Sequence, residues 1–197
     1  MDFKDSEYFD VEFEGEDFTD IEVSKISFYN CHFKKCNFKE TVFNKCLFDS
    51  TDFESCNFAL SKLPESSFKE CEFSSCNLKA VNWSEARWPS ILVVSQINFF
   101  ECDLSHSTFM GVSLKEAIFL DCKLHNTDFR DANMSRSKLN RCDLSGALFN
   151  NTELEGASFL ESVEYDINFH ENNIKQAEFS LPEAIALLRH LDIVLKE

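Results

Sequence analysis

The chain has 197 residues and a formal net charge of −16. Its mean hydropathy is −0.26, and it lacks an apolar run near the roughly twenty residues of a membrane span. Its four glycines are scattered, no catalytic motif is present, and its five histidines lack partners at metal-ligand spacing. No basic face of any length is expected either. We therefore expect one domain that is not an enzyme, takes no cofactor or metal, binds no nucleic acid directly and does not enter a membrane.

A period of five residues runs from residue 3 to residue 83. A large apolar residue, most often Phe, occupies every fifth position, labelled i, and a small residue stands at i−2. This period fits neither a helix nor the simple alternation of a strand. Side chains two apart on an extended backbone point the same way, so i−2 and i face inward while the other residues turn a corner. Five residues therefore form one side of a coil.

Four such sides would close a turn of about twenty residues, which stacks on the next turn at about 4.8 Å. The i residues then form ladders, such as Phe33, Phe53 and Phe73. We expect an all-β solenoid that is held together by its own repeats.

The acidic residues are concentrated at the start of the chain, where Lys4 is the only basic residue before residue 25. Residues 25–98 are nearly neutral. The acidity has two interpretations, solubility or recognition of a basic groove. The predicted acidic tip consists of Asp10, Glu12, Glu14, Glu16, Asp17 and Asp20.

All nine cysteines occupy i−2 positions, which predicts a packing role for free thiols. Cys36, Cys56 and Cys76 should stack in one column, and Cys102, Cys122 and Cys142 in another. A column of sulfur atoms along an axis does not converge tetrahedrally on a metal ion.

The repeat stops at residues 84–98 and resumes at Phe99 with its phase moved by one residue. This divides the chain into a first β-helix segment (1–83), an interruption (84–98) and a second β-helix segment with decaying repeats (99–179). The interruption is either a protruding loop, with Arg87, Trp88 and Pro89 as a partner contact, or a buried bulge that returns the apolar residues 91–94 to the core.

Residues 180–197 depart from the repeat. Ser180 and Glu183 have the spacing of a capping box, Pro182 suits a first turn, and an α-helix of about three turns is expected, followed by a short strand at residues 193–195. The helix would cap the open end of the solenoid. Apolar residues beyond those needed for the cap indicate a dimer surface, predicted at Leu181, Ile185, Leu188, Leu191, Ile193 and Val194.

The repeats CNFKE, TDFES, CNLKA, CDLSH and TDFRD resemble the pentapeptide-repeat family. The resemblance implies a right-handed quadrilateral β-helix, here with a C-terminal α-helix cap. The layout of two coils around one interruption, with a final helix, resembles the gyrase-protecting members: the Qnr quinolone-resistance group and, more closely, the microcin B immunity type.

That resemblance implies a cytoplasmic homodimer, joined at the C-terminal ends, whose acidic rod mimics DNA. Such proteins bind DNA gyrase or topoisomerase IV and protect it from topoisomerase poisons. The near-neutral residues 25–98 depart from a continuous acidic stripe. The alternative function is a structural or scaffold protein with another protein partner and no topoisomerase activity.

Overall fold

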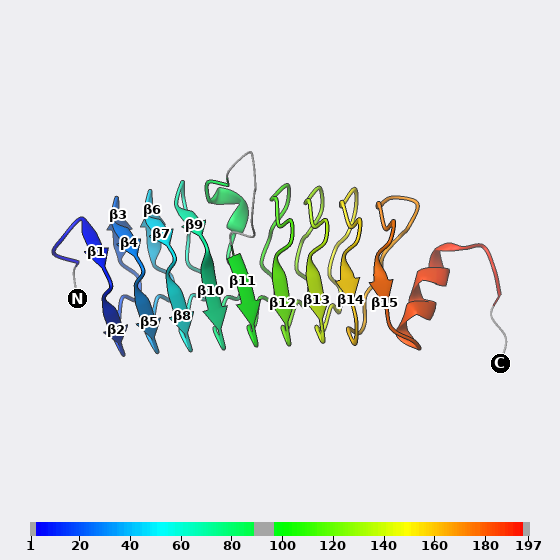
Figure 1. Ribbon diagram of the computed structural model, residues 1–197, viewed down its shortest axis with the longest axis horizontal. Helices are drawn as coiled ribbons and strands as arrows, with labels where there is room; N and C mark the ends of the chain where they lie inside the picture. The colour runs from blue at the N-terminus through cyan, green and yellow to red at the C-terminus, as the bar shows by residue number, and fades with distance from the viewer. Residues whose placement is uncertain (1–2, 89–96, 195–197) are drawn as a thin grey trace.

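The computed structural model describes residues 3–88 and 97–194, and these form a rod of stacked coils (Figure 1). The first coil stands at one end of the rod and a helix at the other. Every strand pair is parallel, and equivalent strands of successive coils lie side by side along the rod. The predicted all-β solenoid is therefore confirmed.

The coil has four sides, named A to D in chain order. Side A is a four-stranded sheet, side B a nine-stranded sheet that runs the length of the rod, and side D begins with a two-stranded sheet. Side C is built from isolated bridges such as Asp17↔Asn37 and Asn37↔Asn57.

The strands of side A are β1 (Glu7–Phe9), β4 (Ser27–Tyr29), β7 (Leu47–Asp49) and β9 (Ser67–Lys69), and those of side D are β3 (Glu22–Ser24) and β6 (Val42–Asn44). The strands of side B are β2 (Glu12–Glu14), β5 (His32–Lys34), β8 (Asp52–Glu54), β10 (Cys71–Ser74), β11 (Ile97–Phe100), β12 (Ile118–Leu120), β13 (Lys138–Asn140), β14 (Ser158–Phe159) and β15 (Glu178–Phe179). Within residues 3–88 and 97–194, two 3-10 helices complete the fold, η1 (Trp83–Glu85) and η2 (Glu183–His190).

The core consists of the predicted ring ladders. Phe33 and Phe53 stack with centroids 5.3 Å apart and planes 8° apart, and Phe53 stacks on Phe73 at 4.5 Å. Rings of adjacent columns meet edge to face, as Phe28 and Phe33 do at 5.2 Å and 76°. Offset stacking along a column and edge contacts between columns are the two arrangements that aromatic quadrupoles favour.

The corners of the coil explain the polar part of the repeat. The residue at i+2 has a positive φ at nearly every corner, and all four glycines of the chain occupy such corners. At several corners, the side chain of an Asp or Asn at i−1 accepts a hydrogen bond from the backbone N–H two residues later. Asn37 Oδ1 accepts from Lys39 N at 3.3 Å, and Asp103 Oδ1 from Ser105 N at 3.2 Å. The Asx turn therefore shapes these corners.

The interruption adds six residues to one coil. Phe73 pairs with Phe99 across a separation of 26 residues, whereas Phe53 and Phe73 are 20 apart. The core ladders continue past the insertion, because Trp83 stacks on Phe109 at 5.6 Å and 5°. Pro89 and the apolar residues 91–94 lie outside the described residues, so the choice between loop and bulge stays open.

The predicted C-terminal helix is present as η2, but its geometry is that of a 3-10 helix and not of an α-helix. The predicted capping box does not form, because both of its side chains bind the preceding coil. Ser180 Oγ accepts from Glu161 N at 3.0 Å, and Glu183 Oε1 accepts from Glu164 N at 3.0 Å. The N-cap position of η2 is Pro182, with no side-chain cap. Residues 191–194 form no strand, and residue 195 lies outside the described residues.

Candidate protein-interaction surfaces

The helix η2 covers the open end of the rod. Side chains three apart eclipse one another in a 3-10 helix, so each third of the helix surface is a separate ridge. Ala186 is buried, and Leu187 packs against the core. His190 Nε2 lies 2.7 Å from Asp166 Oδ1, in the connection between β14 and β15. These contacts join two of the ridges to the rod.

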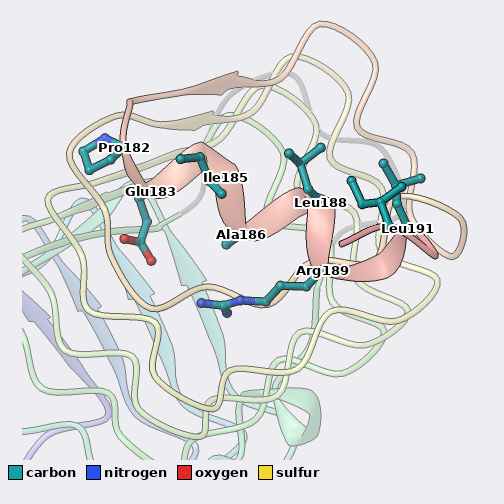
Figure 2. A pocket seen from close by; sticks show the side chains of 8 residues that line it. Pro182, Glu183, Ile185, Ala186, Leu188, Arg189 and Leu191 are labelled. Carbon is teal, nitrogen blue, oxygen red and sulfur yellow. The ribbon is translucent and has the colours of Figure 1, made fainter. Parts of the chain in front are cut away.

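The third ridge is not covered. It carries Pro182, Ile185, Leu188 and Leu191, and Figure 2 shows Leu188 and Leu191 on the side of the helix opposite Arg189. A hollow of about 400 Å³ lies beside it, lined by Pro182, Glu183, Ile185, Ala186, Leu188, Arg189, Leu191 and Ile193.

Four of the six predicted dimer residues, Ile185, Leu188, Leu191 and Ile193, line this hollow. The other two do not line it but are the most exposed large apolar side chains of the region, Leu181 at 81% and Val194 at 84%. Leu160 and Val163, on the last full coil, are also exposed. Sequence reasoning missed these two, although an apolar residue at an outward position was the available signal.

The decaying repeat before the helix closes the coil. Tyr165 and Ile167 are fully buried, and the Tyr165 ring lies 5.5 Å from that of Phe179, which stacks on Phe159 at 5.0 Å. Burial, with a smaller contribution from the Glu183 carboxylate, raises the pKa of Tyr165 to about 12. These residues leave the five-residue period and fill the end of the core.

The interruption begins with Arg87 exposed and Trp88 folded back. Arg87 Nη2 lies 3.5 Å from Glu65 Oε2 on the neighbouring coil. Trp88 is half-buried against the core, and its indole Nε1 donates to the Trp83 carbonyl at 2.8 Å. Trp88 stands five residues after Trp83, a signal for an inward position that the partner-contact prediction did not use. Contact with a partner through Arg87, Trp88 and Pro89 stays a prediction.

The acidic tip is not neutralised by neighbouring cations. Among the described residues from Asp5 to Glu22, the carboxylate of Glu14 alone forms an ion pair, with Lys35 at 3.9 Å. Hydrogen bonds from the Thr19 hydroxyl and backbone hold the pKa of Asp17 below its usual range. Asp17 therefore keeps its negative charge at neutral pH.

In the middle of the rod, unlike at the acidic tip, many charged side chains form ion pairs. Four lysines of the first coils lie beside an acid: Lys34 by Glu54, Lys35 by Glu14, Lys39 by Glu40 and Lys45 by Glu65. The same pairing between coils holds Lys69 by Asp49 and Arg141 by Asp121. Lys34, Lys35, Lys39 and Lys45 lie close together in the sequence, and these pairs reduce the positive charge that the four lysines present to a partner.

Side B carries more acidic than basic residues on its outward positions and corners. The acidic residues are Glu12, Glu14, Asp52, Glu54, Glu72, Glu101, Asp121, Glu161 and Glu178, and the basic residues are Lys34, Lys35, Lys138 and Arg141. Among the described residues, this sheet has the most strands. Three of its acids are paired, because Glu14, Glu54 and Asp121 lie beside Lys35, Lys34 and Arg141.

The two predicted cysteine columns are one column. Cys56 N donates to Cys76 Sγ at 3.3 Å, and Cys76 N donates to Cys102 Sγ at 3.4 Å across the insertion. All nine thiols are free and buried. Burial raises the pKa of Cys71 to about 12, so this thiol is protonated at neutral pH. In the described part of the chain, no group of three His, Cys, Asp or Glu residues is placed to hold a metal ion, and no helix has the length and apolarity needed to cross a membrane.

Comparison with known proteins identifies the repeats. The model of the pentapeptide repeat region matches residues 26–94 and 92–159, and no curated protein sequence matches the chain. One trypsin-treated form of QnrB1, a plasmid-mediated fluoroquinolone resistance protein, has a TM-score of 0.66 and 17% identity over 97% of this chain and 99% of that chain. A second trypsin-treated form has a TM-score of 0.57 and 16% identity, with 96% and 100% covered.

Full-length QnrB1 has a TM-score of 0.50 and 16% identity, with 95% of this chain and 100% of that chain covered. At these identities the likeness concerns the fold. The family assignment rests on the repeat model, which spans well over half of the residues. The chain belongs to the pentapeptide-repeat family.

Proposed function

We propose that this protein binds DNA gyrase or topoisomerase IV and protects the enzyme from topoisomerase poisons. The observation that carries the proposal is the mutual coverage with QnrB1, which is 97% of this chain and 99% of that chain. The likeness thus extends over the whole rod, including its ends. In this proposal the protein acts in the cytoplasm and does not itself bind nucleic acid.

The charge distribution supports entry into a DNA-binding groove. Binding of DNA to such a groove depends on phosphates that replace counterions on Lys and Arg side chains. The uncompensated carboxylates of the tip, and the acidic surplus of side B, offer negative charge on a rigid support. Successive strands repeat at about 4.8 Å, so the carboxylates form a row rather than a scattered cloud.

A homodimer through the C-terminal ends is part of the proposal. Ile185 and Ile193 are about half exposed, and Leu181 and Val194 are almost fully exposed. Removing such side chains from water stabilises an interface by about 25 cal/mol per Å² of apolar surface. Two rods joined at these ends would place their acidic tips at the far ends of the assembly.

A scaffold function with a different protein partner is the second candidate. The near balance of acidic and basic residues over residues 25–98 favours it, and several of these charges also pair between neighbouring coils. In that function the acidic residues serve solubility, and topoisomerase activity is not affected by the protein.

The test is a gyrase supercoiling assay with a fluoroquinolone and, separately, a peptide poison, in which this protein is titrated from below to well above the enzyme concentration. Protection predicts recovery of supercoiling at low protein concentration. A variant lacking the six residues 89–94 restores the 20-residue separation between Phe73 and Phe99, so it should lose protection while its thermal unfolding stays cooperative. Inhibition without recovery would contradict protection, and no effect on either reaction would favour the scaffold function.

A further inference from the structure

An aromatic pair lies on the outside of side A, apart from the core ladders. Phe9 on β1 and Tyr29 on β4 are partners in the parallel register, and their rings stack with centroids 4.9 Å apart and planes 9° apart. Phe9 is 57% exposed, the highest value for any aromatic residue among the described exposed side chains. Both occupy outward positions, so the core does not require their rings.

Carboxylates flank this stack. Glu7 stands two residues before Phe9 on the same strand, so both side chains point outward on the same side. Asp10 follows Phe9 at the corner, and its Oδ1 accepts from Asn30 Nδ2 at 2.5 Å. Within the described part of the chain, neither Glu7 nor Asp10 forms an ion pair. The nearest lysine in the same row, Lys69, is held by Asp49 at 3.0 Å.

An exposed aromatic ring beside carboxylates without an ion-pair partner favours binding of a cation. A guanidinium group is planar and weakly hydrated, so it can stack on a ring face while it donates two parallel hydrogen bonds to a carboxylate. A lysine ammonium offers a point charge without a stacking plane. Nucleic acid and a second copy of this acidic end are both repelled by the surrounding charge.

We infer that the Phe9–Tyr29 stack, with Glu7 and Asp10, is a docking site for an arginine side chain on a basic segment of a protein partner. The site goes beyond the proposed function, because it is defined by its own chemistry and holds for a topoisomerase or for any other partner. At the acidic end of the rod, the carboxylates attract the basic segment by charge. The Phe9–Tyr29 stack then discriminates arginine from lysine.

The experiment compares two labelled probes of equal charge, a nona-arginine and a nona-lysine peptide, by fluorescence anisotropy at low ionic strength. The intact protein should bind the arginine peptide about threefold to fivefold more tightly, which is the size of one exposed cation–π contact. Phe9→Ala should remove this preference while leaving the affinity for the lysine peptide nearly unchanged. Glu7→Gln should weaken the binding of both peptides.

Two controls keep the result interpretable. Phe9→Leu keeps the apolar volume without an aromatic face, so it should lose the arginine preference even if Phe9→Ala destabilises the first coil. Met110→Ala removes an exposed apolar side chain of side D and should keep the preference. Equal affinity of the intact protein for the two peptides would overturn the inference, and so would an arginine preference that survives in both Phe9 variants.

Discussion

At the scale of single residues, the strain at the corners is a measurable part of the fold. Placing a non-glycine residue in the left-handed region costs about 1 kcal/mol of folding free energy. The chain accepts this cost at most corners and uses glycine at four of them. At the corners after Asp or Asn, the Asx turn offsets part of the cost with a hydrogen bond.

Two glycine corners allow the strain to be separated from crowding. Gly111 has φ +71° and no atom within 4 Å of the position that an added Cβ would take, so Gly111→Ala should lower the free energy of unfolding by about 1 kcal/mol, from strain alone. At Gly146 a Cβ would lie 2.5 Å from Oδ1 of the exposed Asn126 side chain, which must turn away, so Gly146→Ala should cost only slightly more than Gly111→Ala. Urea unfolding of both variants measures the difference. Equal stability of Gly111→Ala and the unchanged protein would contradict the strain argument.

Because the Cys71 thiol is buried, we expect the free energy of unfolding to fall at alkaline pH. The pKa of Cys71 is raised to about 12 by burial, whereas an unfolded thiol titrates near about 8.5. Below the unfolded value both states keep the proton. Between the two values only the unfolded state releases it, so the free energy of unfolding falls by about 1.4 kcal/mol per pH unit for this thiol.

Cys71→Ser should reduce that slope, measured by urea unfolding between pH 9 and pH 10.5. The fold should tolerate serine, because Ser66 occupies the same repeat position and its Oγ donates to the Phe43 carbonyl at 2.8 Å. The slope between pH 6 and pH 8 is the internal control and should not change. An unchanged alkaline slope would show that Cys71 ionises equally in both states.

At the scale of elements, the 3-10 geometry of η2 decides which leucine faces the rod. Leu187 packs against the core, and Leu188 lines the outer hollow. Leu187→Glu should therefore destabilise the fold, whereas Leu188→Glu should leave the melting temperature of the protomer nearly unchanged and shift the proposed dimer to monomer. Light scattering after gel filtration measures the mass, and circular dichroism the unfolding. A monomeric unchanged protein would contradict dimerisation through this end.

The C-terminal element also shows what the sequence could not reveal. Ser180 and Glu183 have capping-box spacing, but they bind N–H groups of Glu161 and Glu164, on a coil about twenty residues earlier. Local spacing carries no information about such competing donors. The ladders of Phe33, Phe53 and Phe73 were predictable, because a strict period places equivalent residues in one column without reference to distant contacts.

Charge pairing was hidden from the sequence for the same reason. Lys34, Lys35, Lys39 and Lys45 form a basic cluster along the chain, yet three of them pair with acids on neighbouring coils. The exposed Phe9 was indistinguishable from a core ring by composition, although its position outside the five-residue period was the available signal. The acidic tip was predictable because the first residues contain almost no cations to pair with.

At the scale of the whole molecule, the fold is a rigid rod with an uncompensated acidic end and an apolar end. The apolar end offers a surface for self-association, and the acidic end and side B offer negative charge to a basic groove. The insertion lengthens one coil by six residues without interrupting the core, since the ladders continue through Trp83 and Phe109. Substitutions in the insertion should therefore leave the rod intact.

The most direct test of a topoisomerase-binding DNA mimic is a competition experiment. Fluorescently labelled protein is bound to gyrase, and unlabelled linear duplex DNA is added while anisotropy is recorded at several salt concentrations. We predict that DNA displaces the protein and that the affinity of the protein for gyrase falls steeply with salt, because both ligands use the same basic groove. Absence of binding to gyrase, or binding that saturating DNA leaves unchanged, would contradict the proposed function.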